Sequence, residues 1–401
     1  MSRVAETAAR TIGVGLVSVG WMGRLHSRSY RALAERYPEL GADIRLVIAA
    51  DPVATAAQEA VERLGYAAST ADYLEVINHP EVDVVSICSP NFLHREIAMA
   101  AIAAGKPFWI EKPMGRNAAE SREIAEGAAA AKLVTAVGFN YRHAPAIAHA
   151  RELVRTGKLG TITNVRCTLF ADYSSDPAGA LTWRFERDKA GSGVLGDLLS
   201  HGFDLAQYLV GDITEVTALT DTFIKERPEA TSANAGHFSR GTGGPMRPVE
   251  NEDHAAVLAR LSGGAVGTFE SSRVAIGPRA EYSIEVYGTD GSLRWNFERL
   301  NELEVCLRSS DEYGFTRVMA GPQHGEFGVF QPGAGIGMGF DDLKVIEAML
   351  FIRSVLTGTQ LAPSVADCWS TAEIIEAATA SAASGLWQPV RAVVGGRTAN
   401  A

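Results

Sequence analysis

The residue types best suited to proton transfer gather in one short segment, Asp197 to Asp204. Asp197 and His201 are four residues apart, and this spacing places two side chains next to each other on one face of a helix. A carboxylate beside an imidazole fixes its tautomer and supports its protonated form. The pair is therefore a candidate general base that takes a hydroxyl proton as hydride leaves. Asp204 is an alternative partner for His201, and an ordinary polar pair is the alternative interpretation.

A second candidate segment, Glu111-Lys112-Pro113, follows a short apolar run. If that run is a strand of a parallel sheet, Lys112 lies at the carboxyl edge of the sheet, where α/β proteins bind their ligands. Taken alone, a lysine at this position is more often a surface charge.

A glycine-rich segment, Gly15 to His26, joins an apolar run to a helical pattern. Gly20 would let the backbone approach a pyrophosphate, and Gly23 would let the helix pack closely on a sheet. The helix start would offer N–H groups and a positive dipole end to phosphates. Ser18 replaces the first glycine of the common G-x-G-x-x-G pattern. The location of the segment nevertheless favours dinucleotide binding over an ordinary tight turn.

Asp51 ends the second apolar run, where a carboxylate can accept hydrogen bonds from both hydroxyls of an adenosine ribose. The alternative is that Asp51 only caps the next helix. A ribose contact predicts NAD rather than NADP, because a 2′-phosphate would place a second anion near the carboxylate. No Arg or Lys occurs at residues 52–54, although Arg24 could reach round to such a phosphate.

The elements that must position these residues alternate regularly over the first 138 residues. The expected strands are 12–19, 44–50, 82–88, 108–110 and 133–138, and the expected helices are 22–36, 52–64, 94–104 and 117–131. Continuous apolar strands that alternate with helices predict a doubly wound parallel sheet, because both sheet faces are then covered. We therefore expect an α/β Rossmann domain at residues 1–138.

The pattern changes at residue 139. The expected helices are 144–156, 195–209, 341–356 and 366–383, and the expected strands are 162–171, 216–224, 255–261, 265–274, 282–287 and 292–297. This order predicts an α+β second domain at residues 139–401, with a large, mainly antiparallel sheet. Residues 227–250, rich in Gly, Pro and Ser, predict an exposed loop of the length that is usually functional.

Composition excludes several classes of protein. The chain has 401 residues, is 46% hydrophobic and 21% charged, and carries a formal net charge of −10, so nucleic acid and anionic membrane surfaces are poor candidates as partners. Its four cysteines are scattered, and no dense His and carboxylate cluster indicates a metal. The first ten residues lead into no hydrophobic region typical of a signal peptide, and no apolar run is long enough to span a membrane. We expect a cytoplasmic protein.

Five motifs in order resemble the glucose–fructose oxidoreductase/inositol dehydrogenase/MocA (Gfo/Idh/MocA) family over roughly residues 13–387. They are Ser18-x-Gly20-x-x-Gly23, Cys88-Ser89-Pro90-Asn91-Phe92-Leu93-His94, Glu111-Lys112-Pro113, Gly138-Phe139-Asn140-Tyr141-Arg142 and Asp197-x-x-x-His201. The resemblance implies Lys112, Asp197 and His201 as the catalytic residues and NAD as the cofactor. It also implies a homo-oligomer, dimer or tetramer, that associates through the open face of the second sheet. The implied cofactor-binding residues are Ser18, Gly20, Trp21, Met22, Gly23, Asp51, Ser89, Pro90, Asn91, His94, Glu111 and Lys112.

Within the family, segments 181–185, 190–193 and 330–337 resemble the levoglucosan dehydrogenase and sugar 3-dehydrogenase subfamily. The candidate substrate-binding residues are then Tyr141, Arg142, Trp183, Asp197, His201 and His324, with Asp172 and Tyr173 as weaker candidates. Trp183 could stack on a sugar face, and Arg142 could bond hydroxyl groups.

The resemblance implies NAD-dependent oxidation of a secondary hydroxyl of a sugar, anhydrosugar, glycoside or inositol. One alternative is a redox-neutral glycosidase that keeps its NAD and acts through a transient 3-keto sugar. Another is a dinucleotide sensor without catalysis, against which the presence of Lys112, Asp197 and His201 argues.

Overall fold

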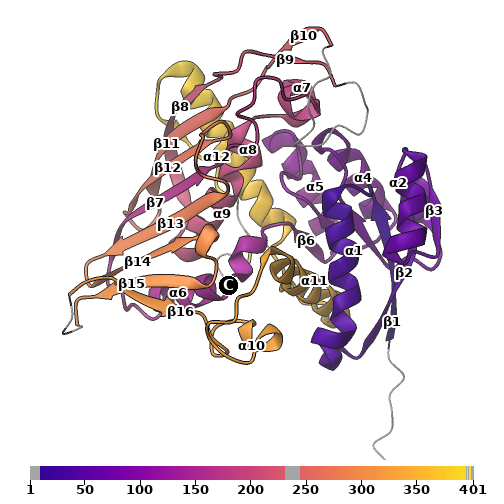
Figure 1. Ribbon diagram of the computed structural model, residues 1–401, viewed down its shortest axis with the longest axis horizontal. Coiled ribbons are helices and arrows are strands. Elements are labelled where there is room, and N and C mark those ends of the chain that lie inside the picture. The colour runs from indigo at the N-terminus through magenta and orange to yellow at the C-terminus, as the bar shows by residue number, and fades with distance from the viewer. Residues whose placement is uncertain are drawn as a thin grey trace, which may run out of the picture.

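The computed structural model describes residues 10–230, 244–309, 311, 313–393, 395 and 397–398. Two sheets form its frame, a six-stranded sheet from the amino-terminal part of the chain and a nine-stranded sheet from the rest (Figure 1). The expected combination of a Rossmann domain with a second, mainly antiparallel sheet is confirmed.

The six-stranded sheet is parallel throughout, in the order β3-β2-β1-β4-β5-β6. Its strands are β1 (Arg10–Val17), β2 (Ala42–Ala50), β3 (Ala68–Thr70), β4 (Val84–Ile87), β5 (Phe108–Ile110) and β6 (Thr135–Val137). Its helices are α1 (Trp21–Arg36), α2 (Ala54–Glu59), α3 (Tyr73–Asn78), α4 (Asn91–Ala103) and α5 (Ala118–Ala130). The strand order reverses direction between β1 and β4, and ligands of doubly wound sheets bind outside the carboxyl ends of strands at such a point.

The nine-stranded sheet has the order β16-β15-β14-β13-β7-β12-β11-β8-β17, and only β7 and β12 pair in parallel. Its strands are β7 (Ile162–Phe170), β8 (Ile213–Asp221), β11 (His254–Leu261), β12 (Val266–Ser272), β13 (Glu281–Gly288), β14 (Gly291–Asn296), β15 (Glu302–Leu307), β16 (Thr316–Met319) and β17 (Gln388–Pro389). A separate pair joins β9 (Glu226–Pro228) to β10 (Met246–Pro248).

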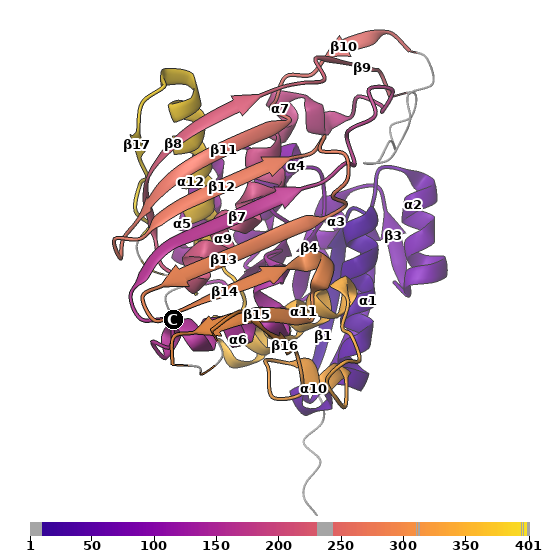
Figure 2. The ribbon, with the colours of Figure 1, turned by 60° about the vertical axis from the view of Figure 1, so that its left-hand side comes forward.

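Helices cover one face of this sheet (Figure 2). They include α6 (Pro145–Arg155), α9 (Leu199–Leu209) and α12 (Val365–Ser384). The strands alternate between residues buried under these helices and residues on the other face, where Leu219, Leu258 and Val266 are half or more exposed. Two helices also pack on the Rossmann half, because α12 contacts α5 and α11 (Phe340–Thr357) contacts α1.

Several expected elements differ in detail. The helix expected at 52–64 is α2 followed by a π-helical turn, Ala60–Leu64. The helix expected at 195–209 is two helices, α8 (Val194–Asp197) and α9, separated at Leu198. The expected loop at 227–250 contains β10 and most of β9, and its residues 231–243 lie outside the described part.

Candidate active site

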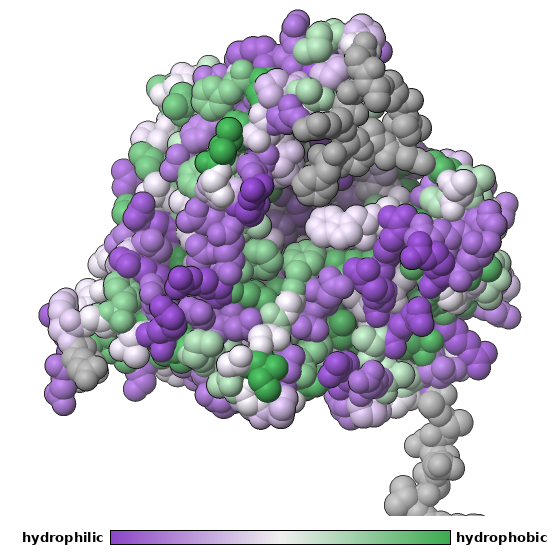
Figure 3. Space-filling model, in the orientation of Figure 1, coloured by the Kyte–Doolittle hydropathy of each residue, from purple (hydrophilic) through white to green (hydrophobic). Residues whose placement is uncertain are grey.

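One pocket of about 540 Å³ lies where the carboxyl edge of the parallel sheet faces the second domain. Residues of both halves line it, from Trp21, Cys88 and Lys112 on one side to Trp183 and His201 on the other. The space-filling view shows the surface hollowed between the two halves of the molecule (Figure 3).

The glycine-rich loop between β1 and α1 has the geometry that a pyrophosphate needs. Ser18 has φ = 75°, the left-handed conformation that glycine usually supplies, so serine fills the first glycine position without changing the turn. A Cβ atom on Gly20 would meet no atom of the described residues within 4 Å, so the Gly20 backbone borders open space in this part of the structure. A Cβ atom on Gly23 would lie 2.1 Å from the Ser18 carbonyl oxygen, so only glycine lets α1 approach the loop this closely.

Asp51 follows β2, and its carboxylate is held by the neighbouring backbone. One oxygen accepts a 2.8 Å hydrogen bond from the Val19 N–H, and the other accepts a 2.9 Å bond from the Val53 N–H. The carboxylate thus fixes the glycine-rich loop, and each oxygen keeps a lone pair that a ribose hydroxyl could use. Arg24 is engaged elsewhere, in a bidentate pair with Glu59 at 2.6 and 3.0 Å.

The segment after β4 forms the next part of the expected cofactor site. Ser89 and Asn91 line the pocket, and the buried Ser89 hydroxyl oxygen has no hydrogen-bond partner among the described residues. An orphaned buried hydroxyl together with an open glycine backbone fits a bound dinucleotide. The ring nitrogens of His94 lie 2.7 Å from the Ser89 carbonyl oxygen and 2.9 Å from that of Pro113, so His94 braces the two loops.

The predicted cofactor-binding residues fall into two groups. Trp21, Met22, Ser89, Asn91, His94, Glu111 and Lys112 line the pocket, whereas Ser18, Gly20, Gly23, Asp51 and Pro90 are not part of its lining.

Lys112 and Asp197 form a pair across the pocket. The Lys112 ammonium donates to the Asp197 carbonyl oxygen at 2.6 Å and to its carboxylate at 3.2 Å. Tyr173 donates its hydroxyl to the other carboxylate oxygen at 2.9 Å. Asp197 therefore holds Lys112 from two directions, and Tyr173 orients the carboxylate.

These contacts explain why α8 and α9 are separate, which corrects the expectation of one continuous helix through Asp197 and His201. In such a helix the Asp197 carbonyl would accept the His201 N–H. Here that carbonyl faces Lys112, and the His201 N–H donates to the Leu198 carbonyl at 3.1 Å.

His201 lies near the start of α9 and is 7% exposed. The ring of Tyr141 packs against the imidazole at 4.7 Å, and the Tyr282 hydroxyl donates to the His201 backbone carbonyl at 2.7 Å. Burial lowers the pKa of His201 well below its usual 6.5, and the charges of Lys112 and Lys344 lower it further, against the opposing effect of Glu111 and Asp197. Asp197 does raise this pKa, as expected, but burial and the two lysines outweigh its effect. The imidazole is neutral at neutral pH and can accept a proton.

Two predicted substrate-binding residues do not line this pocket. Arg142 is buried, and its guanidinium binds the carboxylates of Asp204, through a bidentate pair, and Asp367. Asp204 is thus the partner of Arg142, and this ion pair ties α9 to the 3-10 helix that contains Arg142. His324 packs on His149 with ring centroids 4.4 Å apart and accepts the Gly321 N–H. The other substrate candidates, Tyr141, Trp183, Asp197 and His201, line the pocket, as do Asp172 and Tyr173.

The pocket also contains cations that sequence analysis missed. They are Arg184, Arg273, Arg279 and Lys344. Of these, Lys344 had a detectable signal, because Lys344 and Glu347 interrupt an otherwise apolar helical stretch at a spacing of three residues.

The described residues provide neither a metal-binding cluster nor a membrane-spanning helix. Within the described ranges, no group of three or more His, Cys, Asp and Glu side chains is arranged to hold a metal ion. None of the described helices is long and apolar enough to cross a membrane.

Comparison with known families matches both halves of the chain. Residues 12–139 match the oxidoreductase family with an NAD-binding Rossmann fold, and residues 147–294 match the GFO/IDH/MocA C-terminal domain. Levoglucosan dehydrogenase of Pseudarthrobacter phenanthrenivorans is 39% identical over 95% of this chain and 98% of its own length. Inositol 2-dehydrogenase of Rhizobium meliloti is 25% identical over 93% of this chain and 97% of its own length.

Among solved structures, levoglucosan dehydrogenase in complex with NADH and levoglucosan superposes with a TM-score of 0.89 at 36% identity. The match covers 96% of this chain and all of that one. The same enzyme in complex with NADH and L-sorbose gives a TM-score of 0.90 at 36% identity, over 95% of this chain and 99% of that one.

Proposed function

This chain belongs to the GFO/IDH/MocA family of NAD-binding oxidoreductases, and from that membership we propose that it oxidises one secondary hydroxyl group of a sugar, an anhydrosugar, a glycoside or an inositol to a ketone. The observation that carries the proposal is the meeting of Lys112, Asp197 and His201 in a single pocket whose lining also includes Ser89 and Asn91. We assign residues 1–138 to cofactor binding and residues 139–401 to substrate binding and association.

The proposed mechanism gives each of the three residues a task. NAD, which the glycine-rich loop and residues 89–91 would hold, would supply the hydride acceptor for the carbon that carries the reacting hydroxyl. His201, neutral because of its buried and cationic surroundings, takes the hydroxyl proton. Lys112, held by Asp197, donates a hydrogen bond to the reacting oxygen and stabilises the negative charge that develops on it. Asp197 thus has two roles. It positions Lys112 through two hydrogen bonds, and its charge acts on His201.

Identity to levoglucosan dehydrogenase favours an anhydrosugar or a related pyranose as substrate. Trp183 supplies an aromatic surface of the kind on which sugar rings stack. A panel of 1,6-anhydrosugars, monosaccharides, glycosides and cyclitols, with formation of NADH followed by absorbance, tests the proposal. NADH that accumulates with turnover indicates a dehydrogenase. Release of an aglycone without accumulating NADH would instead indicate a redox-neutral glycosidase, and no NADH from any compound would contradict the proposed substrate class.

The pH dependence of the reaction should follow His201. A general base must be deprotonated, so the oxidation rate rises with pH through the pKa of the base. Because burial, Lys112 and Lys344 lower the pKa of His201, we expect this limb below pH 6.5 and a plateau at neutral pH. The check is the pH profile of kcat/KM with a carbon-deuterated substrate, whose isotope effect shows that hydride transfer limits the rate. A limb centred above pH 7 would contradict the assignment.

Cofactor preference should favour NAD over NADP by at least ~10-fold in kcat/KM. A 2′-phosphate would place a second anion beside Asp51, and ~1.4 kcal/mol of repulsion already gives a factor of ten. Arg24, a cation near Asp51, is paired with Glu59 and is therefore not free to bind the 2′-phosphate of NADP. Steady-state kinetics with both cofactors measure the ratio, and Asp51→Ser should narrow it. Equal use of NADP by the unmodified enzyme would show that Asp51 does not face the ribose.

We also propose that the protein is a homo-oligomer that associates through the helix-free face of the nine-stranded sheet. Leu219, Leu258 and Val266 lie exposed on that face, and large exposed apolar patches commonly mark protein interfaces. Leu258→Glu should dissociate the assembly in sedimentation velocity, and a wild-type monomer would contradict the proposal.

A further inference from the structure

Lys344 is a lysine in the interior of the protein that also borders the pocket. It lies on the second turn of α11, its side chain is 1% exposed, and it belongs to the pocket lining. A buried ammonium is costly unless it is paired. Its partners therefore indicate what it does.

The ammonium of Lys344 binds two carboxylates. It donates to Glu111 Oε1 at 2.7 Å and lies 2.8 Å from Glu347 Oε2. The same Glu111 oxygen lies 2.9 Å from Nε2 of His26, on α1, and the His26 ring stacks on Trp109 at 3.4 Å. The Glu111 carboxylate is thus held from two sides, by α1 of the Rossmann half and by α11.

Glu111 directly precedes Lys112 at the end of β5. The Glu111 side chain occupies a tight space, because a Cβ atom on Gly138 would lie 2.4 Å from its Oε2 atom. Consecutive side chains at this strand end are therefore both bound, Glu111 by Lys344 and Lys112 by Asp197. The backbone between them has little freedom to shift.

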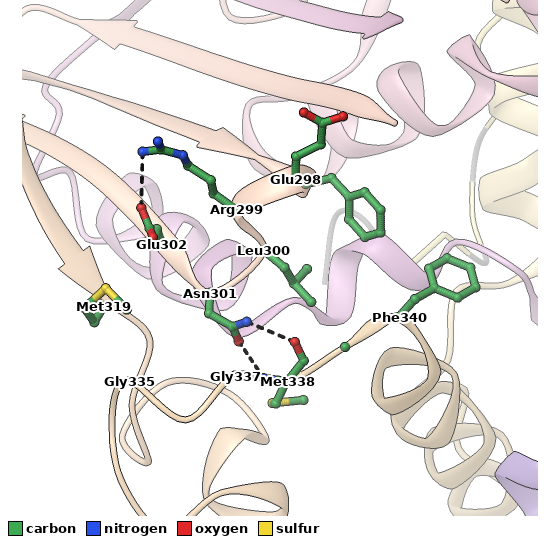
Figure 4. A pocket seen from close by; sticks show the side chains of 12 residues that line it. Glu298, Arg299, Leu300, Asn301, Glu302, Met319, Gly335, Gly337, Met338 and Phe340 are labelled. Carbon is green, nitrogen blue, oxygen red and sulfur yellow. Dashed lines mark hydrogen bonds and ion pairs between the residues drawn. The ribbon is translucent and has the colours of Figure 1, made fainter. Parts of the chain in front are cut away.

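The position of α11 is fixed independently of Lys344. A pocket of about 390 Å³ lies beside the start of α11. At this pocket Asn301 exchanges two hydrogen bonds with the Met338 backbone, at 2.9 and 3.0 Å (Figure 4). Near the far end of α11, Arg353 pairs with Glu39 at 3.2 Å. These contacts, together with its packing on α1, hold α11 in the place from which Lys344 reaches Glu111.

The charges around Lys344 and His201 form one connected group. Lys344 faces Glu111, Glu347 and His26, and the 3-10 helix Asn140–His143 adds Tyr141 and His143. His201 is influenced by Lys112, Lys344, Glu111 and Asp197. Burial raises the pKa of Glu347 above its usual range, whereas Lys344 and His26 hold that of Glu111 below its usual range despite burial, so Glu111 is the principal anion paired with Lys344.

We infer that Lys344 is a positioning residue for the proposed dehydrogenase reaction, which holds Glu111 and thereby keeps the adjoining Lys112 in its working geometry. The inference rests on the proposed function of Lys112. It has an electrostatic consequence as well. Without Lys344, the uncompensated Glu111 carboxylate would favour the protonated form of His201.

The decisive comparison is Lys344→Met against Arg353→Met. Both variants remove one cation of α11 that pairs with a carboxylate of the Rossmann half, but only Lys344 reaches Glu111. For Lys344→Met we expect kcat to fall roughly 10- to 100-fold, because small displacements of a catalytic group have such effects, with little change in KM for NAD. Arg353→Met should leave kcat unchanged, and Lys344→Arg should retain most of the activity.

A second measurement does not depend on turnover. In the NAD-bound protein labelled with 15N-histidine, the His201 resonance is assigned by its loss in His201→Gln and titrated by NMR. Lys344→Met should raise the pKa of His201 by roughly one unit, since a nearby cation is lost and a carboxylate is left unpaired. A defect confined to stability would lower the amount of active protein without moving this titration. An unchanged titration, or an equal shift in Arg353→Met, would overturn the inference.

Should Lys344→Met not fold, the double variant Glu111→Gln/Lys344→Met removes both charges, so no unpaired ion stays buried. The inference then predicts a folded protein with kcat still reduced at least ~10-fold, because Lys112 has lost its support. Wild-type kcat in this variant would overturn the inference. Full activity of Lys112→Met or His201→Ala would instead overturn the proposed function on which it rests.

Discussion

His201→Ala should reduce kcat by ~10²–10⁴, the usual contribution of a positioned acid–base group, equivalent to ~3–5 kcal/mol of barrier. The imidazole lies in the pocket, is neutral at neutral pH, and packs against Tyr141, which fixes its orientation. KM for NAD should change little, because the glycine-rich loop and the segment after β4 are untouched. Steady-state kinetics with the best sugar of the panel give both values.

His201→Gln and Tyr141→Phe are the matched controls. Glutamine keeps a polar side chain of similar length without the basic nitrogen, so its kcat should stay close to that of the alanine variant. Tyr141→Phe keeps the ring that packs on His201 and should preserve most activity if that ring only positions the imidazole. Near-normal turnover in His201→Ala would contradict the base assignment and leave Lys112 as the group to test.

Much of the fold could be predicted because its strands and long helices obey simple periodicity. The buried strands β1, β2 and β4 read as continuous apolar runs, since helices cover both faces of the parallel sheet. The strands of the second sheet alternate, since one face lies under helices. Short elements such as β3 and α3 leave too few residues for a period to be recognised and were missed.

The site could be predicted in its residue types but not in its pairings. Spacing suggested that Asp197 serves His201 on one helix, and Asp197 does influence His201, but spacing gave no sign that Asp197 also binds Lys112. Lys112, 85 residues earlier in the chain, takes the Asp197 carbonyl and breaks the helix at Leu198. Local rules cannot include a hydrogen bond from a distant strand end.

Arg142 and Lys344 also have partners that sequence spacing cannot indicate. Arg142 stands in a motif that suggested a substrate contact, but Asp204 and Asp367 bind its guanidinium in the interior. Lys344 stands in an otherwise apolar helix and was not predicted to belong to the site, but it reaches Glu111 at the pocket. In both cases the decisive partner lies more than 60 residues away in the sequence, where spacing carries no information.

Lys112→Met should be about as severe as the loss of an oxyanion-stabilising donor, a fall in kcat of roughly 10²–10³. Methionine preserves the apolar stem of lysine and removes only the ammonium, so the pocket keeps its shape. The reacting oxygen then loses its cationic hydrogen-bond donor, and the Asp197 carbonyl and carboxylate lose theirs. Stopped-flow measurement of NADH formation in a single turnover separates this loss from product release.

Lys112→Arg and Asp197→Asn identify what the ammonium contributes. Arginine restores the charge, but its planar fork cannot reproduce two contacts from a single nitrogen at 2.6 and 3.2 Å, so recovery should be incomplete. Asp197→Asn leaves the backbone carbonyl contact to Lys112 intact and weakens only the side-chain pair, so its defect should be smaller than that of Lys112→Met. If Asp197→Asn were the more damaging change, the carboxylate would act chiefly on His201. The proposal that Asp197 mainly holds Lys112 would then be wrong.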